Sequence, residues 1–192
     1  MFQWRRRRER GATLVEAALA FPILILVIIS ILELGMAFKD YLTVSYLSRE
    51  AARIGALAGD DPYADCAILL GIENLATEGD LRRIQQVRIY RASPTTGLPV
   101  TGFNTGSWRD NGNPPLCTVP NDPMDTWTVN STAWPTSDRE VSVGPDVSPD
   151  IIGVRITLDR NWITGFPPFR GSMTVDESTI TRLEPKAFFP DS

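Results

Sequence analysis

The stretch that decides the fold is Gly11-Ala12-Thr13-Leu14-Val15-Glu16, followed by an apolar run to Phe38 in which only Ser30 and Glu33 are polar. A helix needs about 20 mostly apolar residues to cross the hydrocarbon core of a bilayer. The run is longer than that, with Glu16 just before it and Glu33 toward its outer end. The sequence therefore predicts one membrane span over about residues 14–38.

Five arginines among the first ten residues set the orientation of this span: Arg5, Arg6, Arg7, Arg8 and Arg10. Because basic residues stay on the cytoplasmic side, we expect the N-terminus inside and everything after about residue 40 outside. The protein is predicted to be a single-pass protein of the cytoplasmic (inner) membrane. A cleavable signal peptide fits less well, because the apolar run is too long and no good cleavage site follows it.

Glu16 lies near the inner end of the span. A charged side chain at the bilayer centre costs about 2.5–3.5 kcal/mol, and less near the edge, so a carboxylate there suggests a function. One interpretation is structural, with Glu16 reaching back to the headgroups and the arginines. The other depends on Gly11, five residues earlier. Cleavage after Gly11 would expose an α-amine at Ala12, one helical turn from Glu16.

The order of these residues resembles the class III prepilins and, more specifically, the TadE-like minor pilins of Tad (Flp) pilus systems. The resemblance rests on a basic leader that ends at Gly11 and on three later motifs: Val15 to Pro22 as Val-Glu-x-Ala-Leu-x-x-Pro, Glu33-Leu34-Gly35, and Arg49-Glu50-Ala51-Ala52-Arg53. Arg182-Leu183-Glu184-Pro185 is similar to the closing segment of many relatives. The likeness covers residues 5–59 and is only architectural beyond them.

The resemblance implies that a prepilin peptidase removes the leader, residues 1–11, and leaves Ala12 first. It implies a role in the assembly, initiation or capping of a pilus, with the protein incorporated in the filament or resident in the membrane. Other pilins, major Flp-type and minor, an inner-membrane assembly platform and membrane lipid would be its partners. Glu16 would pair with the α-amine of a neighbouring subunit, since a buried carboxylate costs less when it is paired.

Pro22 and Glu33 are two further assembly candidates within the span. Pro22 removes one helical hydrogen bond and permits a kink, which helices in lipid also tolerate without a special role. Glu33 lies near the outer interface, where we expect solvation rather than a partner.

The helix is expected to continue beyond the membrane, over residues 12–59. Between Glu33 and Ala58 the sequence has no proline, and the glycine and aspartates after Ala58 lead into Pro62, a stop signal. Ala51, Gly55 and Gly59 recur at every fourth position, which lets another backbone approach closely. The expected partner of this small-residue face is the chain's own outer domain, with another subunit's helix as the alternative.

Residues 60–192 are predicted to form one extracytoplasmic domain, so the fold class is α+β. Asp61-Pro62 would start a second helix over Tyr63–Glu78, broken by Gly79-Asp80. Alternation predicts an antiparallel sheet, whose expected strands lie at 87–91, 126–130, 152–158 and 173–183. The last two would form a hairpin joined by residues 160–171, with a bulge near 176–178. Residues 93–125 and 131–149 are interpreted as loops, from their glycine and proline content.

Two features of the outer domain allow more than one interpretation. Cys66 and Cys117 could form a disulfide, which an oxidising compartment favours, or remain as buried thiols. Trp162, Phe166 and Phe169 lie between the last two strands. Exposed, they would be a contact patch for another pilin or a substrate; folded back on the helix, they would be core, which we favour.

The sequence offers no constellation for catalysis. It has no histidine and only two cysteines, and its acidic pairs lack the spacing of a calcium loop. We therefore expect no enzyme activity, no cofactor and no metal. The net charge is −4, and removal of the leader leaves 14 basic and 22 acidic residues, or −8, which argues against nucleic-acid binding.

Two other functions stay open. The chain could be an unprocessed, membrane-anchored binding protein with an extracytoplasmic domain. It could also be a pseudopilin of a type II secretion system, which shares the processing step but would more usually begin its mature chain with an aromatic residue, where this chain has Ala12.

Overall fold

The computed structural model describes residues 4–109, 127–165, 167 and 169–185, and its chain forms two compact units. The first, called here the span unit, consists of Met1–Lys39 and Asn161–Gly171. The second, the globular unit, consists of Asp40–Arg160 and Ser172–Ser192. Helices and an antiparallel sheet follow one another along the chain, which confirms the predicted α+β class.

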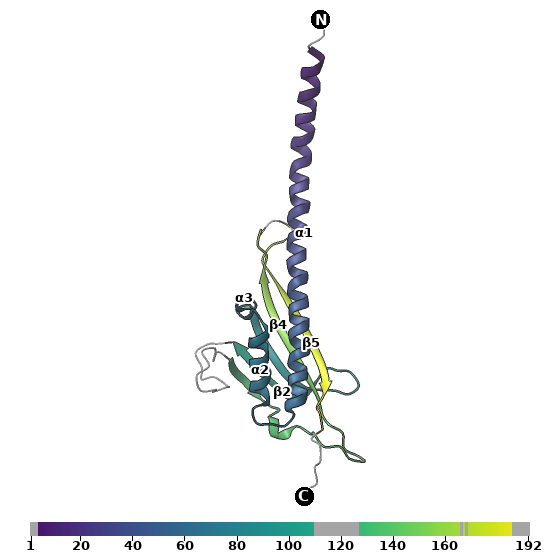
Figure 1. Cartoon of the computed structure of the whole chain (residues 1–192), viewed down its shortest axis with the longest axis vertical. Coiled ribbons are helices and arrows are strands. Elements are labelled where there is room, and N and C mark those ends of the chain that lie inside the picture. The colour runs from purple at the N-terminus through teal and green to yellow at the C-terminus, as the bar shows by residue number, and fades with distance from the viewer. Residues whose placement is uncertain (1–3, 110–126, 166, 168, 186–192) are drawn as a thin grey trace. The chain divides into compact units, whose positions relative to one another are not determined.

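The first helix, α1, runs from Trp4 to Ala58 (Figure 1). It begins eight residues before the expected start at Ala12, because the arginine-rich leader is helical too. It ends as expected at Gly59, which has a φ of 56° and whose N–H donates to the Gly55 carbonyl at 3.0 Å. Glycine takes this left-handed conformation without strain, so it terminates the helix.

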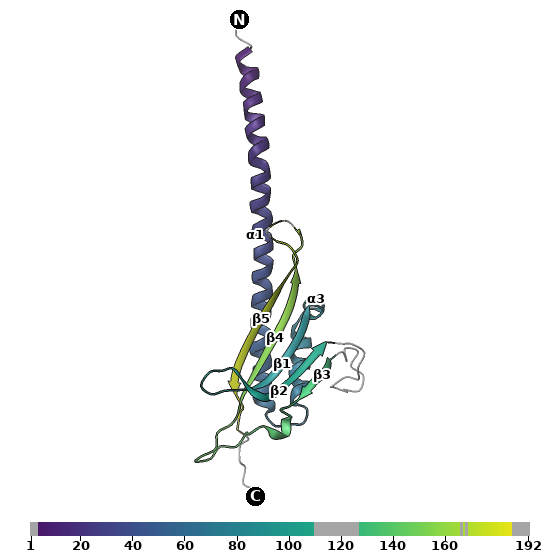
Figure 2. The ribbon, with the colours of Figure 1, turned by 180° about the vertical axis from the view of Figure 1, so that it is seen from behind.

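The globular unit contains a five-stranded sheet in the order β3-β2-β1-β4-β5. Its strands are β1 (Ile84–Ala92), β2 (Pro99–Arg109), β3 (Trp127–Thr132), β4 (Ile151–Asn161) and β5 (Ser172–Arg182). β1 pairs antiparallel with both β2 and β4, with Ile89 opposite Thr105 on one side and Val154 on the other. β4 and β5 are the predicted hairpin, and they run in opposite directions in Figure 2.

Two helical elements cover one face of this sheet: α2 (Ala64–Leu75) and the part of α1 that belongs to the globular unit (Figures 1 and 2). Val44 and Leu47 of α1, Ile68 and Ile72 of α2 and the inward residues of β1 and β4 form the core. The predicted role of the small residues is confirmed. A Cβ at Gly55 would stand 2.8 Å from Ile152 Cδ1, so the helix packs closely against β4 and a larger residue there would displace that side chain.

Several details differ from the sequence prediction. α2 begins at Ala64 and ends at Leu75, and Gly79 and Asp80 lie inside a separate short helix, α3 (Glu78–Leu81), which the Thr77 side chain caps. β2 occupies part of the stretch interpreted as loop, and a 3-10 turn, η1, covers Thr136–Asp138. Exposure alternates along the whole of β5, so no bulge is needed to explain its pattern at 176–178.

Candidate functional site

The first part of α1 presents side chains to its surroundings on every side. From Thr13 to Ile28 all of them are exposed. By length and composition this helix can cross a membrane, with a mean hydropathy of 2.7 over its most apolar window and none of that window buried. A helix that is apolar all round needs either a protein core or lipid around it. An apolar N-terminal helix of this kind can serve as a membrane anchor.

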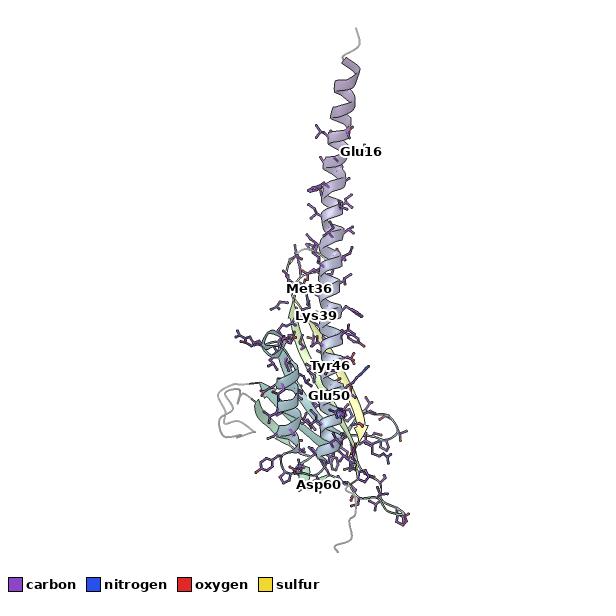
Figure 3. The ribbon with its side chains drawn as sticks, in the orientation of Figure 1. Glu16, Met36, Lys39, Tyr46, Glu50 and Asp60 are labelled. Atoms are coloured by element: carbon purple, nitrogen blue, oxygen red, sulfur yellow. The ribbon has the colours of Figure 1, made fainter. Side chains whose placement is uncertain are left out.

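The predicted processing site lies inside α1. Gly11 and Ala12 both belong to the helix. Glu16, one turn further on, is exposed and projects from the helix (Figure 3). Pro22 is interior to α1, where it costs the helix one backbone donor but does not end it. Cleavage after Gly11, and assembly roles for Glu16 and Pro22, stay predictions.

Glu33 is fully buried, so the expectation that it would be solvated is wrong. Its Oε1 accepts a hydrogen bond from the Thr164 backbone N–H at 2.8 Å and another from Thr164 Oγ1 at 2.9 Å. Thr164 belongs to the β4–β5 loop, which is part of the span unit. The sequence does not reveal this pairing, because 131 residues separate its two members.

The β4–β5 loop carries the predicted aromatic patch. Trp162 and Phe169 contact each other across the neck of the loop, with ring centroids 5.0 Å apart, and the Trp162 N–H donates to the Gly171 carbonyl at 3.3 Å. Both rings are half-buried, whereas Ile163 between them is 69% exposed. Phe166 lies outside the described residues. The rings are thus neither full core nor fully exposed, and their use as a contact patch stays a prediction.

A buried charge network holds the globular end of α1. Asp40, 2% exposed, accepts two hydrogen bonds from the Arg83 guanidinium, at 2.9 and 2.8 Å, and a third from Arg160. Arg83 also donates to Asp80 at 2.7 Å. Asp80 in turn accepts from Thr77 Oγ1, also at 2.7 Å. The network therefore joins α1, α3, the start of β1 and the end of β4 within the globular unit.

The two arginines decide the charge state of Asp40. Burial alone would raise the pKa of Asp40, but the hydrogen bonds and positive charges of Arg83 and Arg160 outweigh it and hold the pKa below its ordinary value. The Asp40 hydrogen bond in the same way raises the pKa of Arg83. Sequence reasoning missed this network. Its one local signal is that Asp40 stands seven residues after Glu33 and so lies on the same side of the helix.

Two of the acidic residues that lack calcium-loop spacing hold backbone groups at turns and element ends. Asp61 Oδ1 accepts the Tyr63 N–H at 2.8 Å, just before α2. Asp150 forms an ion pair with Arg91 at 2.8 Å and accepts the Glu140 N–H at 3.1 Å. These contacts fix turns and strand ends, and they give no arrangement suited to catalysis.

Cys66 lies in α2, half-buried against the core. Cys117 lies outside the described residues. The disulfide between them therefore stays a prediction.

Residues 11–53 match the model of a family described as TadE-like protein. The N-terminal helix of this chain carries a TadE-like segment. The match confirms the resemblance seen in the sequence, because it begins at Gly11 and ends at Arg53 and so contains all three motifs after the leader. The TadE-like family suggests an association with a Tad pilus. No curated protein and no solved structure matches the chain.

Proposed function

We propose that this chain is a TadE-like minor pilin, cleaved by a prepilin peptidase between Gly11 and Ala12, that takes part in building a Tad pilus. The observation that carries the proposal is the position of the TadE-like segment. It lies on a helix whose first part, from Thr13 to Ile28, has every side chain exposed. That part of the helix therefore has a surface available to lipid before assembly and to other pilins afterwards.

Processing would create the positive group with which Glu16 pairs. Cleavage after Gly11 removes five arginines and leaves a positive α-amine at the start of the helix. In lipid a lone carboxylate is costly, and an amine from a neighbouring subunit lowers that cost by pairing with it. Glu16 is exposed on α1, so its carboxylate is accessible to the α-amine of a neighbouring subunit. It acts as a docking group and not as a catalyst.

The same helix offers a lateral surface in the globular unit. Its buried side faces β4 and α2, while Leu42, Tyr46 and Leu57 on the other side are each about half-exposed. Large apolar side chains exposed along one helix face are typical of surfaces that contact another protein or a membrane. Fellow pilins, major or minor, are the partners that the TadE-like segment favours, together with the inner-membrane assembly platform.

The first experiment determines the mature N-terminus of the full chain in a host that carries a Tad system. We expect Ala12 as the first residue. Gly11→Leu should block processing, whereas Gly35→Leu, a substitution further along the same helix, should leave it unchanged. A mature chain that keeps Met1 or Phe2 contradicts the proposal and supports a membrane-anchored binding protein instead.

The second experiment tests docking separately from processing. Glu16→Gln should still yield Ala12 but lower crosslinking to other pilins about tenfold, the effect of losing about 1.4 kcal/mol. Glu50→Gln is the matched control, because Glu50 pairs with Arg53 on the surface of the same helix. If Glu16→Gln leaves both crosslinking and fibre yield at the level of the Glu50→Gln control, the docking role of Glu16 is wrong.

A further inference from the structure

The β4–β5 loop and the membrane-spanning part of α1 form one compact unit, the span unit, although about 120 residues separate them in the chain. The loop leaves the sheet at Asn161, carries Trp162, Ile163 and Thr164 to α1, and returns through Phe169 to Gly171. Figures 1 and 2 both show the start of this loop beside α1. The loop is therefore placed with the apolar helix rather than with the core of the globular unit.

We propose that this loop is a second membrane contact, in which Ile163 and the rings of Trp162 and Phe169 enter the outer leaflet of the bilayer that α1 spans. The proposal rests on the span assigned above, and it adds a lipid-binding site in a part of the chain far from the TadE-like segment. The partner is the boundary between phospholipid headgroups and acyl chains.

Depth along the helix is the first argument. Thr164 hydrogen-bonds to Glu33 through both its N–H and its hydroxyl, so the loop is held at the level of Glu33. Glu33 precedes the expected outer end of the span, Phe38, by five residues, or about 7.5 Å of helix. Interfacial membrane elements bury their apolar face about 5–10 Å into the boundary between headgroups and acyl chains. The loop therefore lies at the depth that such elements occupy.

The chemistry of Glu33 is the second argument. A carboxylate within the outer edge of an apolar stretch loses water and needs donors from the protein. Thr164 supplies two donors to Oε1 of Glu33, which is fully buried. The loop thus satisfies a buried carboxylate that belongs to the apolar stretch of α1. The pair thus removes the main cost of placing both the helix and the loop at this depth.

The composition of the loop is the third argument. Residues 161–171 contain no acidic residue and one arginine, Arg170, in a chain whose net charge is −4. Arg170 is exposed, and so is Ile163, whose side chain has about two thirds of its surface accessible. Aromatic rings at the membrane boundary, with an arginine beside anionic headgroups, are the usual composition of an interfacial anchor.

The test places one environment-sensitive fluorescent amino acid in the full chain by stop-codon suppression, which leaves Cys66 and Cys117 intact. The positions are Ile163, Val143 and Leu24. Val143 is the matched control, because it is an apolar residue with the same 69% exposure but belongs to the globular unit. Leu24 lies in the middle of the span and reports whether α1 has inserted.

The chain is reconstituted in vesicles of phosphatidylcholine and phosphatidylglycerol without any other protein. Emission is then quenched either by aqueous iodide or by a lipid that carries a doxyl group near the top of its acyl chain. We expect the probe at 163 to be quenched by the doxyl lipid and to be several-fold less sensitive to iodide than the probe at 143. The probe at 24 should be shielded from iodide as well.

Each other outcome overturns the inference in an identifiable way. If 24 is shielded but 163 behaves like 143, the chain spans the membrane and the loop lies in water. If 163 is shielded from both quenchers, protein covers it, either this chain or a second copy. If 24 is open to iodide, α1 has not inserted, and the proposed function fails together with the lipid contact.

Discussion

The two parts of α1 belong to one continuous helix but differ in how their side chains are buried. From Thr13 to Ile28 no side chain is buried, whereas from Asp40 to Ala58 burial follows the helical period, with Val44, Leu47 and Gly55 among the inward residues. In the part of the chain that the structure describes, the side chains of the first part are exposed, whereas the second part is packed against a sheet. The comparison teaches that one continuous helix can expose apolar side chains at one end, as a membrane anchor would, and pack against its own domain at the other.

This difference leads to a general expectation. Equivalent substitutions in the two parts of α1 should act on different properties: folding of the globular unit for the second part, and insertion or assembly for the first. Matched pairs of substitutions along the same helix therefore test the comparison directly, with unfolding of the full chain in detergent as the common measurement.

Asp40→Asn should have the largest effect on folding. It leaves Arg160, whose side chain is 5% exposed, without the Asp40 carboxylate, and breaking a buried ion pair costs about 3–5 kcal/mol. Urea unfolding followed by near-ultraviolet circular dichroism measures this loss. Glu16→Gln, the acid on the other part of the helix, should leave the unfolding midpoint unchanged while it weakens assembly. Equal effects of the two substitutions on unfolding would contradict the comparison.

The contribution of Asp40 should also depend on pH. Its folded pKa lies below the ordinary value of 3.8, so the carboxylate stabilises the fold fully above that value and its contribution falls as the pH drops through the lowered pKa. The difference in unfolding free energy between the wild type and Asp40→Asn should be constant above about pH 5 and should shrink in acid. Unfolding series at several pH values measure it. A difference that grows in acid has the wrong sign for this network.

Leu47→Ala and Leu24→Ala form the apolar pair. Leu47 is 1% exposed in the core of the globular unit, so its truncation should cost about 2–5 kcal/mol through lost burial and a cavity. Leu24 is 56% exposed, and its truncation should change the unfolding of the globular unit by less than about 0.5 kcal/mol. The ratio of the two losses is the informative quantity. Similar losses would mean that the span is packed against protein.

Gly55→Leu and Gly35→Leu test the close approach of helix and sheet. At Gly55 even a Cβ would meet Ile152 at 2.8 Å and Ile68 at 2.9 Å, so a leucine must push the helix away and should cost about 1–3 kcal/mol. At Gly35 a Cβ would meet no atom within 4 Å, so the globular unit should be unaffected. Thermal unfolding of both variants provides the measurement. A stable Gly55→Leu protein would show that the packing there is loose.

How much of the fold and of the candidate site the sequence predicts depends on how far apart in the chain the interacting residues stand. The long apolar helix, its end at Gly59 and the hairpin of β4 and β5 follow from local patterns, and the structure confirms them. That the first part of this helix spans a membrane stays a prediction. Glu33 and Asp40 could not be placed, because their partners stand from 43 to 131 residues away in the chain. Sequence patterns report which faces are apolar, and they do not report which distant polar group meets a buried carboxylate.

β2 shows the same limit in a strand. Its sequence, Pro99–Arg109, contains two glycines and a proline, residues that are depleted in strands. It forms a strand because β1 pairs with it on one side and β3 on the other, which supplies the hydrogen bonds that local propensity does not. The candidate processing site differs again: Gly11 and Glu16 are recognised from spacing, and their roles depend on a peptidase and on neighbours that a single chain does not contain.

The smallest expected effect is also the most specific test of the comparison. Ser48 Oγ hydrogen-bonds to Thr179 Oγ1 at 3.0 Å, which links α1 to β5, whereas Ser30 Oγ donates to the Leu26 carbonyl of its own helix at 2.8 Å. Ser48→Ala should cost about 0.5–1.5 kcal/mol, because Thr179 loses a partner across the interface. Ser30→Ala should cost nothing measurable, because the Leu26 carbonyl already accepts a backbone hydrogen bond within the helix. A double-mutant cycle of Ser48→Ala with Thr179→Ala isolates the contact, and a coupling energy near zero would mean that α1 is held against β5 by apolar packing alone.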